Sequence, residues 1–529
     1  MNKYVENNIL CQVGGSQRAN SCEPTIDVYE FLIHGNTKGE YKLHPIKSIM
    51  GNISVKTGGT LLHSIDVISD DSDKIIPNLP TDFNIENTKI NEIIYFFYTV
   101  YLNKSVRGKN TLQSFWGREV NCDYFIMLIK SIAKQKKIFL MDRLDSKHTY
   151  IQKVSVDKDT HTVVIGDIHG SFHSFFRILL RLARFGILNL ETFELKDNAR
   201  LIFLGDVVDR GFYCMEILLL IFLLIKNNSN KVFYNRGNHE ELQINFTNGF
   251  WSEVSSKISE INLAKKIFKM INDYYTLCPS AIIVECQGKQ VYLCHGGFSK
   301  HQKNLRIEFG DSDIFLLSDR KKNKDKSLQT GVFTRWSDFA VKCGYVITND
   351  KVSEQPTNSC IDRGFGSCSC IYPEDLEHFL RENSEIYGIV RGHTDNLGSN
   401  LIFSNLIDRT DYYSSSALRL TNYENLLSKN GIFYNESLKG CICRINLSDF
   451  KNSSYKINLK EKGKYIYPVL TTSTNTDYMR NLNTDGFVMI RFDILDATKF
   501  NTSYGYDENK LVNIDIMSLF GKHSTCTSN

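Results

Sequence analysis

From about residue 155 onward, short β-branched and aliphatic runs alternate with segments of helical apolar spacing. This alternation is typical of an α/β layer architecture. Earlier in the chain, residues 91–102 and 124–137 also carry apolar residues at helical spacing. The greasiest stretch is MEILLLIFLLI, residues 215–225. Because it is about half as long as the ~20 residues that a membrane span needs, it predicts a buried helix.

Five of the apolar runs stop directly before side chains that can bind a metal ion or a phosphate. The runs and the residues after them are VVIGDIHG (163–170), LIFLGDVVDRG (201–211), VFYNRGNHEE (232–241), VYLCHGG (291–297) and IYGIVRGHTD (386–395). Ligands of α/β folds bind at the carboxyl ends of strands, so the five ends are expected to converge on one crevice. One such string alone is more often a structural turn, but five in one chain predict a site.

Six side chains at these ends offer carboxylate, imidazole and amide groups and no thiolate. They are Asp167, His169, Asp206, Asn238, His295 and His393. Closed structural zinc sites favour cysteine, whereas oxygen and imidazole ligands suit open Mn, Fe or Zn centres. Six ligands are too many for one catalytic ion with open positions, but they suit two ions ~3.5–4 Å apart. The sequence therefore predicts a two-metal centre.

The order of these motifs resembles the metallophosphoesterases and, within them, the phosphoprotein phosphatase family of Ser/Thr protein phosphatases. GDIHG, GDVVDRG, RGNHE and HGG stand almost as the family pattern writes them. Later elements of the family are similar to CPSAIIV (278–284), RWSDF (335–339), IDRGFG (361–366) and DYMRNLNTDGFVMI (477–490). The likeness covers residues from about 120 to 493. It implies an α/β (α+β) fold, a calcineurin-like β-sandwich of two mixed sheets flanked by helices.

The resemblance also implies how the ligands are shared between two metal ions, expected to be Mn²⁺ or, in vivo, Fe or Zn. Asp167, His169 and Asp206 would hold the first ion. The second would be held by Asp206, which bridges the two, together with Asn238, His295 and His393.

The same resemblance implies catalytic roles. His239 would be the general acid, oriented by Asp209, and Arg210 and Arg363 would bind phosphate oxygens. Tyr478 would line the substrate pocket, which Asn238 also borders. The implied reaction is in-line attack on phosphoserine or phosphothreonine by a hydroxide that the two metals activate, without a phosphoenzyme.

Structural explanations stand beside some of these roles. Asp209 could cap the helix over 215–225, because aspartate is common at helix starts. Arg210 could pair with a surface carboxylate, and the motif around Arg363 matches the family only in part.

Substrate choice stays open because the sequence departs from the eukaryotic pattern. It has RGHTD at 391–395, where eukaryotic protein phosphatases usually carry Ala-His-Gln. The Gly-His-Thr form is more similar to bacterial or diadenosine tetraphosphatase-type relatives. Hydrolysis of dinucleotide polyphosphates on the same site is therefore an alternative. A pseudophosphatase that binds phosphoproteins is another, although all six ligands and His239 are present.

The likeness divides the chain into three parts. Residues 1–118 form an N-terminal region of unknown fold, for which a regulatory role is a guess. Residues 119–495 form the catalytic domain, with an insertion at about 396–465 that enters beside the rim of the site. Residues 496–529 form a C-terminal tail.

Composition and charge limit the classes of binding partner that the sequence supports. Lys plus Arg number 63 and Asp plus Glu number 59, and this net charge of +4 gives no case for nucleic acid or membranes. Phosphorylated proteins are the expected partners, and a regulatory subunit is a further candidate. The N-terminus lacks a signal-peptide pattern, so a cytoplasmic or other intracellular location is expected.

The fourteen cysteines include the pairs Cys368/Cys370 and Cys441/Cys443, whose spacing favours reduced thiols over zinc.

Overall fold

The computed structural model describes most of residues 112–299 and shorter parts of the rest. These parts are residues 25–35, 40–43, 53–56, 65–67, 90–97 with gaps, 304–305, 312–319, 330–339, 345–348, 351–354, 370–371, 373–393, 400–404, 432–435, 440–446, 466–473 and 484–492. Among the helices so described, none combines the length and the apolar character that crossing a bilayer requires. The intracellular location stays a prediction.

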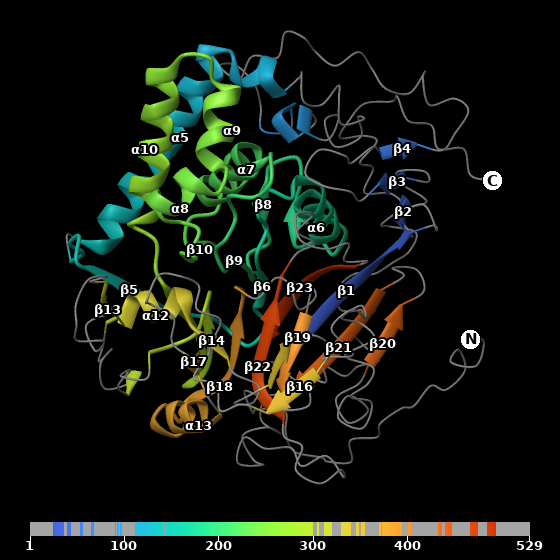
Figure 1. The fold of residues 1–529 in the computed structure, drawn as a ribbon, viewed down its shortest axis with the longest axis vertical. Coiled ribbons are helices and arrows are strands. Elements are labelled where there is room, and N and C mark those ends of the chain that lie inside the picture. The colour runs from blue at the N-terminus through green and yellow to red at the C-terminus, as the bar shows by residue number, and fades with distance from the viewer. Residues whose placement is uncertain are drawn as a thin grey trace.

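Two mixed sheets form the centre of the fold (Figure 1). The first runs in the order β10-β9-β6-β23-β1-β2-β3-β4, and its strands β6, β9 and β10 are parallel neighbours. These strands are β10 (Val232–Tyr234), β9 (Ala199–Phe203), β6 (His161–Ile165), β23 (Thr484–Arg491), β1 (Thr25–Gly35), β2 (Glu40–Leu43), β3 (Ile53–Lys56) and β4 (Ile65–Val67). Strand β23 lies antiparallel to β6, which makes the sheet mixed.

The second sheet runs in the order β13-β5-β11-β12-β18-β22-β19. Its strands are β13 (Ile314–Ser318), β5 (His148–Ser155), β11 (Ala281–Cys286), β12 (Lys289–Cys294), β18 (Ile386–Arg391), β22 (Ile466–Thr472) and β19 (Asn400–Ser404). Strands β12, β18 and β22 are parallel, whereas β11 and β12 form an antiparallel hairpin. Short two-stranded pairs complete the described strands: β7 (Leu188–Asn189) with β8 (Glu194–Leu195), β14 (Asp338–Phe339) with β17 (Cys370–Ile371), and β15 (Tyr345–Thr348) with β16 (Lys351–Glu354).

The two sheets pack face to face around one apolar core, because side chains alternate between the two faces of each strand. In β6, Val164 enters the core between the sheets, while Val163 and Ile165 face the helices. In β12 of the other sheet, Val291 and Leu293 enter the same inter-sheet core. This arrangement confirms the predicted sandwich of two mixed sheets flanked by helices.

Helices cover the outer faces of both sheets (Figure 1). On the first sheet lie α5 (Glu119–Leu140), α6 (Phe172–Arg184), α7 (Cys214–Asn227), α9 (Phe250–Lys257) and α10 (Ile261–Tyr275). The short helix α8 (Leu242–Thr247) instead packs its Ile244 against Val332 and Trp336. On the second lie α12 (Thr330–Trp336) and α13 (Pro373–Glu382). Helices α5 and α7 confirm the helices predicted over 124–137 and 215–225. Within 91–102, the described residues Ile93, Ile94, Phe96 and Phe97 are helical and buried.

The N-terminal region and the insertion both add strands to the first sheet. Strand β1 lies between β23 and β21 (Gly440–Asn446), pairing antiparallel with each along Thr25–Phe31. Strand β20 (Ile432–Asn435) pairs with β21 in turn. The start of the insertion, β19, instead pairs with β22 in the second sheet. The boundaries at 118 and 396–465 stay predictions, and the tail 496–529 lies outside the described residues.

The described cysteine side chains are free thiols: Cys122, Cys214, Cys278, Cys286 and Cys294. Burial raises the pKa of Cys294, the thiol beside His295, to about 12, so this group stays protonated near neutral pH. The side chains of both Cys-x-Cys pairs lie outside the described residues.

Candidate active site

The five predicted strand ends do meet, but they come from both sheets. Strands β6, β9 and β10 of the first sheet are followed by Asp167, Asp206 and Asn238, and β12 and β18 of the second by His295 and His393. The loop backbones are joined directly. The backbone N–H of His169 donates to the Asp206 carbonyl at 2.9 Å. The N–H of Gly296, which follows His295, donates to the Thr334 carbonyl, and that of Gly392, which precedes His393, donates to the His295 carbonyl. The site thus forms where the strand ends of the two packed sheets meet, and the His393 N–H, which donates to Asp167, joins the two sides.

The backbone at these loops is unusual. Nine non-glycine residues of the described chain have positive φ, and five of them are predicted site residues: His169, Asp206, Asp209, Arg210 and His393. Their φ values lie between 46° and 71°, in the left-handed region that costs a non-glycine residue about 1–3 kcal/mol. Such conformations persist only where the surrounding fold imposes them, so this clustering marks a site held in a set geometry.

The Asp206 carboxylate and three other side chains form one group. Nε2 of His295 lies 3.1 Å from Asp206 Oδ2 and 2.9 Å from Asn238 Oδ1. Nδ1 of His393 lies 2.8 Å from Asn238 Oδ1 and 3.2 Å from His295 Nε2. The Nδ1 of His295 is 3.1 Å from the Leu204 carbonyl, which can only accept, so Nδ1 carries a proton and Nε2 turns its lone pair inward. Several electron-pair donors therefore face one point.

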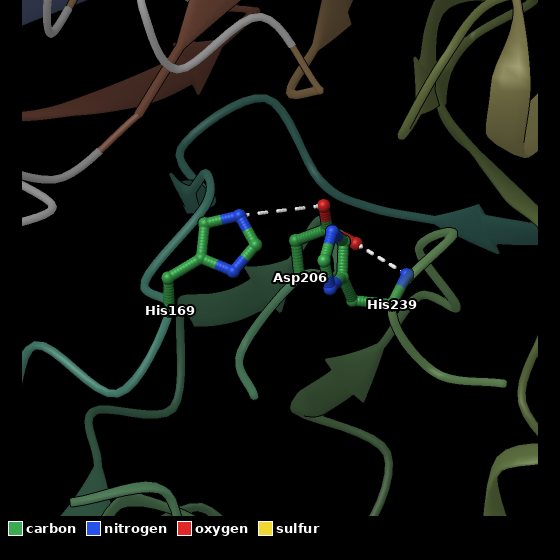
Figure 2. A group of neighbouring side chains, drawn as sticks. All are labelled: His169, Asp206 and His239. Carbon is green, nitrogen blue, oxygen red and sulfur yellow. Dashed lines mark hydrogen bonds and ion pairs between the residues drawn. The ribbon is translucent and has the colours of Figure 1, made fainter. Parts of the chain in front are cut away.

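His169 is arranged in the same way on the other side of Asp206. Its Nδ1 lies 2.9 Å from the Val208 carbonyl, which again assigns the proton to Nδ1. Its Nε2 points to Asp206 Oδ2 at 3.5 Å, and Figure 2 shows the two side chains turned toward one another. Carbonyl partners that fix the ring and free the second nitrogen are the usual outer shell of metal-binding histidines.

Two groups of potential metal ligands thus share Asp206. One contains His169, Asp206 and His239, and the other contains Asp206, His295 and His393, with all members buried and their ligand atoms within 4.8 Å of one another. The chemistry of the donors fits divalent ions such as Mn, Fe or Zn, because imidazole, carboxylate and amide oxygen are present and thiolate is not. The site suits a dinuclear metal centre.

The electrostatics agree with that fit. Burial, together with the charge of Arg210, lowers the pKa of His169 well below its usual value, so its ring is neutral and able to bind a metal. Burial also opposes charge on His295, but the carboxylates of Asp206 and Asp167 outweigh it and raise its pKa. A pocket that attracts a proton this way also attracts a metal cation.

Asp167 lies in the same cluster but not in either group of three. Its Oδ1 accepts the backbone N–H of His393 at 3.0 Å and lies 3.7 Å from His295 Nδ1. The structure thus places Asp167 nearer to the residues expected at the second ion than the sequence suggested, and His239 beside His169. The role of Asp167 as a ligand of the first ion stays a prediction.

The predicted general acid and its partner form a close pair. Nδ1 of His239 lies 2.8 Å from Asp209 Oδ2. The His239 backbone N–H donates to Asp206 Oδ1 at 2.8 Å, as Figure 2 shows. Nη2 of Arg210 lies 3.2 Å from His239 Nε2. Asp209 does not cap the helix after it, because α7 begins with Tyr213 as its N-cap. It accepts instead the N–H of Phe250, the first residue of α9, at 3.1 Å.

Glu240 braces the loop that carries Asp206, a role that sequence reasoning missed. Its two carboxylate oxygens accept the backbone N–H groups of Asp206, Val207 and Gly237 at 2.8, 3.0 and 2.8 Å, and the Tyr234 hydroxyl at 3.0 Å. A side chain at Gly237 would collide with Asp206 Oδ1, so the backbone needs a glycine there. The motif RGNHEE contained this glutamate, but only the fold shows what it holds.

A protein-family model matches the part of the chain that carries these features. Residues 160–396 match the model of the calcineurin-like phosphoesterase family, and this range contains all six predicted ligands, His239, Asp209 and Arg210. Over this range the chain is similar to the calcineurin-like phosphoesterases.

Related proteins with a curated name are serine/threonine-protein phosphatases. A serine/threonine-protein phosphatase of Caenorhabditis elegans is 27% identical over 238 residues, 44% of this chain and 47% of the relative. Serine/threonine-protein phosphatase T of Aspergillus oryzae is 27% identical over 215 residues, 41% of this chain and 37% of the relative. The matches thus span less than half the length of either relative.

A solved structure is similar as well. A protein serine/threonine phosphatase from Saccharomyces cerevisiae is 18% identical, with a TM-score of 0.42 over 72% of this chain and 87% of its own.

Two predicted site residues, Arg363 and Tyr478, lie outside the described residues. Two others that had no predicted role stand close to His393. Asp338 of the RWSDF motif has its Oδ1 3.8 Å from His393 Nε2 and 3.6 Å from Arg391 Nη2. The Arg391 guanidinium also donates to the Ser337 carbonyl at 3.3 Å. Both motifs are visible in the sequence, but only the fold shows that Asp338 of one contacts Arg391 of the other.

A buried ion network supports the loop that carries Arg210. The Lys257 ammonium lies 2.7 Å from Glu216 Oε2 and 2.8 Å from Glu253 Oε1, and donates to the Phe212 carbonyl at 2.6 Å. Glu253 in turn accepts two N–H groups at the start of α7. The Trp116 indole donates to Glu216 at 2.6 Å. Although burial lowers it, the pKa of Lys257 is raised above its usual range by the two carboxylates.

Replacing Lys257 by methionine is expected to lower the free energy of unfolding by about 3–5 kcal/mol, because it leaves two buried carboxylates without their cation. Urea unfolding at neutral pH measures the loss. Lys269→Met is the matched control: its surface pair with Asp273 has the same i,i+4 spacing, and its removal should change stability by less than about 1 kcal/mol. Equal effects of both variants would show that the buried network contributes nothing special.

Proposed function

We propose that the protein is a metal-dependent Ser/Thr protein phosphatase. The observation that carries the proposal is the His239–Asp209 pair beside the carboxylate that both groups of ligands share. A metal centre next to a charge-paired histidine suits hydrolysis of a phosphate ester, because attack and departure occur on opposite sides of one phosphorus atom. The names of the related phosphatases support the same reaction.

Six residues would hold the metals: Asp167, His169, Asp206, Asn238, His295 and His393. When bound, two such ions, with Mn²⁺ the first candidate, would make a water molecule nucleophilic near neutral pH and neutralise charge on the phosphoryl group.

The residues around this centre would bind the substrate and deliver a proton. Arg210 presents a planar guanidinium that suits two phosphate oxygens, and Arg363 would add a second. In the present structure Arg210 Nη2 lies against His239 Nε2, and binding of phosphate would draw it toward the substrate. Nε2–H of His239 would then give its proton to the leaving oxygen while Nδ1–H stays bonded to Asp209. The products are the free alcohol of the serine or threonine and inorganic phosphate.

Partners beyond the substrate belong to the same proposal. Strand β1 and strand β21 bring the N-terminal region and the insertion into the first sheet, so either region could carry contacts to a phosphoprotein or a regulatory subunit. Tyr478 would border the pocket.

Turnover by the full-length, Mn²⁺-loaded protein separates the candidate substrates. We expect phosphate release from a phosphoserine or phosphothreonine peptide, with a higher kcat/KM than cleavage of diadenosine tetraphosphate. The reverse order would transfer the proposal to dinucleotide polyphosphates. If a folded, metal-loaded protein bound the phosphopeptide but cleaved neither compound, the pseudophosphatase alternative would hold instead.

A further inference from the structure

Asn245 lies directly behind the proton-donating pair. It belongs to α8 (Leu242–Thr247), which starts three residues after His239, and its side chain is fully buried. Its amide Nδ2 donates to Asp209 Oδ2 at 2.9 Å and to the backbone carbonyl of His239. One side chain thus contacts both members of the pair, from a position 36 residues beyond Asp209 in sequence.

The orientation of this amide is fixed by its neighbours. A carboxylate and a backbone carbonyl can only accept hydrogen bonds, so the NH₂ group of Asn245 must face Asp209 and His239. Its Oδ1, also buried, has no hydrogen-bond partner among the described residues. An amide kept in place by donation alone, with its oxygen unsatisfied at a cost of about 1–3 kcal/mol, indicates that the two donated bonds matter.

Asp209 depends on donors from three elements. Oδ2 receives His239 Nδ1 at 2.8 Å and Asn245 Nδ2 at 2.9 Å, and Oδ1 receives the Phe250 N–H at 3.1 Å. Removal of the Asn245 donor would leave Oδ2 bonded to the histidine alone and free the carboxylate to rotate about its bond to Phe250. The His239 imidazole, which Asp209 holds in place, would then no longer keep a fixed orientation.

We propose that Asn245 is a positioning residue for proton donation by His239, an inference that rests on the proposed phosphatase function. The Asn245 amide contacts Asp209 and only the main chain of His239, so its bonds do not involve the ligand atoms of the two groups of three. It acts by holding the Asp209 carboxylate and the His239 main chain in one arrangement, so that Nε2 faces the leaving oxygen.

The role predicts a dependence on the leaving group. A serine alkoxide is strongly basic and must be protonated as it departs, whereas p-nitrophenolate is weakly basic and can leave without a proton. Loss of positioning should therefore slow hydrolysis of a phosphoserine peptide by about 10- to 100-fold, part of the 10²–10⁴ that general acid catalysis contributes. Hydrolysis of p-nitrophenyl phosphate should slow by no more than about threefold. Loss of fold would slow both alike.

Asn245→Leu and Asn245→Asp test the inference in the full-length, Mn²⁺-loaded protein. Leucine removes the donor at similar volume, and aspartate replaces it by an acceptor, so either variant keeps the test open if the other does not fold. Asn272→Leu is the matched control. Asn272 is also a buried asparagine that donates to one carbonyl, of Phe268 at 3.0 Å, with its Oδ1 unbonded, but it lies in α10 away from the site. The control should keep wild-type rates on both esters.

Selective loss on the phosphoserine peptide, with the metal content unchanged, is the expected result. Equal losses on both esters, or no loss on either, would overturn the positioning role while leaving the phosphatase proposal intact. A folded wild-type protein that cleaves neither ester would overturn the phosphatase proposal, and this inference with it.

Discussion

Replacing Asp206 by asparagine is expected to abolish both metal binding at the paired site and phosphate release. Its carboxylate is shared by the two groups of ligands, with Oδ2 at 3.1 Å from His295 and 3.5 Å from His169. Although burial opposes ionisation, nearby charges, His295 first, hold the pKa of Asp206 well below its usual range, so the wild-type site keeps a bridging anion. The neutral amide cannot neutralise two cations. Elemental analysis after dialysis against Mn²⁺ should find about two ions per chain in the wild type and close to none in the variant.

Asp319→Asn serves as the control for this substitution. Asp319 is also a mostly buried, ion-paired aspartate, 2.6 Å from Arg335 and 3.4 Å from Arg236, but it stands outside both ligand groups. Its replacement should lower stability without changing the metal content. If Asp206→Asn kept both metal ions and full activity, the bridging role would be wrong.

Replacing His239 by asparagine is expected to keep the metals and to lower kcat on a phosphoserine peptide by about 10²–10⁴-fold. The backbone N–H of His239, which donates to Asp206 Oδ1, is unchanged by the substitution, so the bridging carboxylate stays supported. What is lost is the imidazole, which donates to Asp209 from one nitrogen and faces Arg210 with the other. Steady-state kinetics combined with metal analysis separates the two effects.

His148→Asn is the matched control for that variant. The His148 imidazole also pairs with a carboxylate, Asp145 at 2.6 Å, but on the exposed surface. Its replacement should leave kcat and metal content at wild-type values. A His239→Asn variant that loses its metals would show that this histidine is a ligand, as its grouping with His169 and Asp206 also permits.

Much of the site could be predicted because its residues follow buried strands closely in sequence. The short, almost continuously buried apolar runs of β6 and β9, with a glycine close after each run, indicated where the strands end, and the polar residue types indicated the chemistry. Helix α5 could be predicted from apolar residues at helical spacing, and α7 from a continuous apolar run too short to cross a membrane, since neither pattern needs a distant partner to be recognised.

The supporting residues could not be predicted, because their function depends on contacts between distant segments. Glu240 and Asn245 look like ordinary residues of a polar loop and a short helix until the fold places them against Asp206 and Asp209. The same holds for β1, whose pairing with β23 joins residues more than 450 positions apart in the chain. No local pattern encodes such a pairing, since its partner is chosen by the rest of the sheet.

The most direct test of the account is the anomalous diffraction of crystals grown with Mn²⁺. The account predicts two peaks about 3.5–4 Å apart on either side of the Asp206 carboxylate, one beside His169 and the other beside Asn238, His295 and His393. A single peak, or peaks away from Asp206, would contradict the two-metal centre on which the proposed reaction rests.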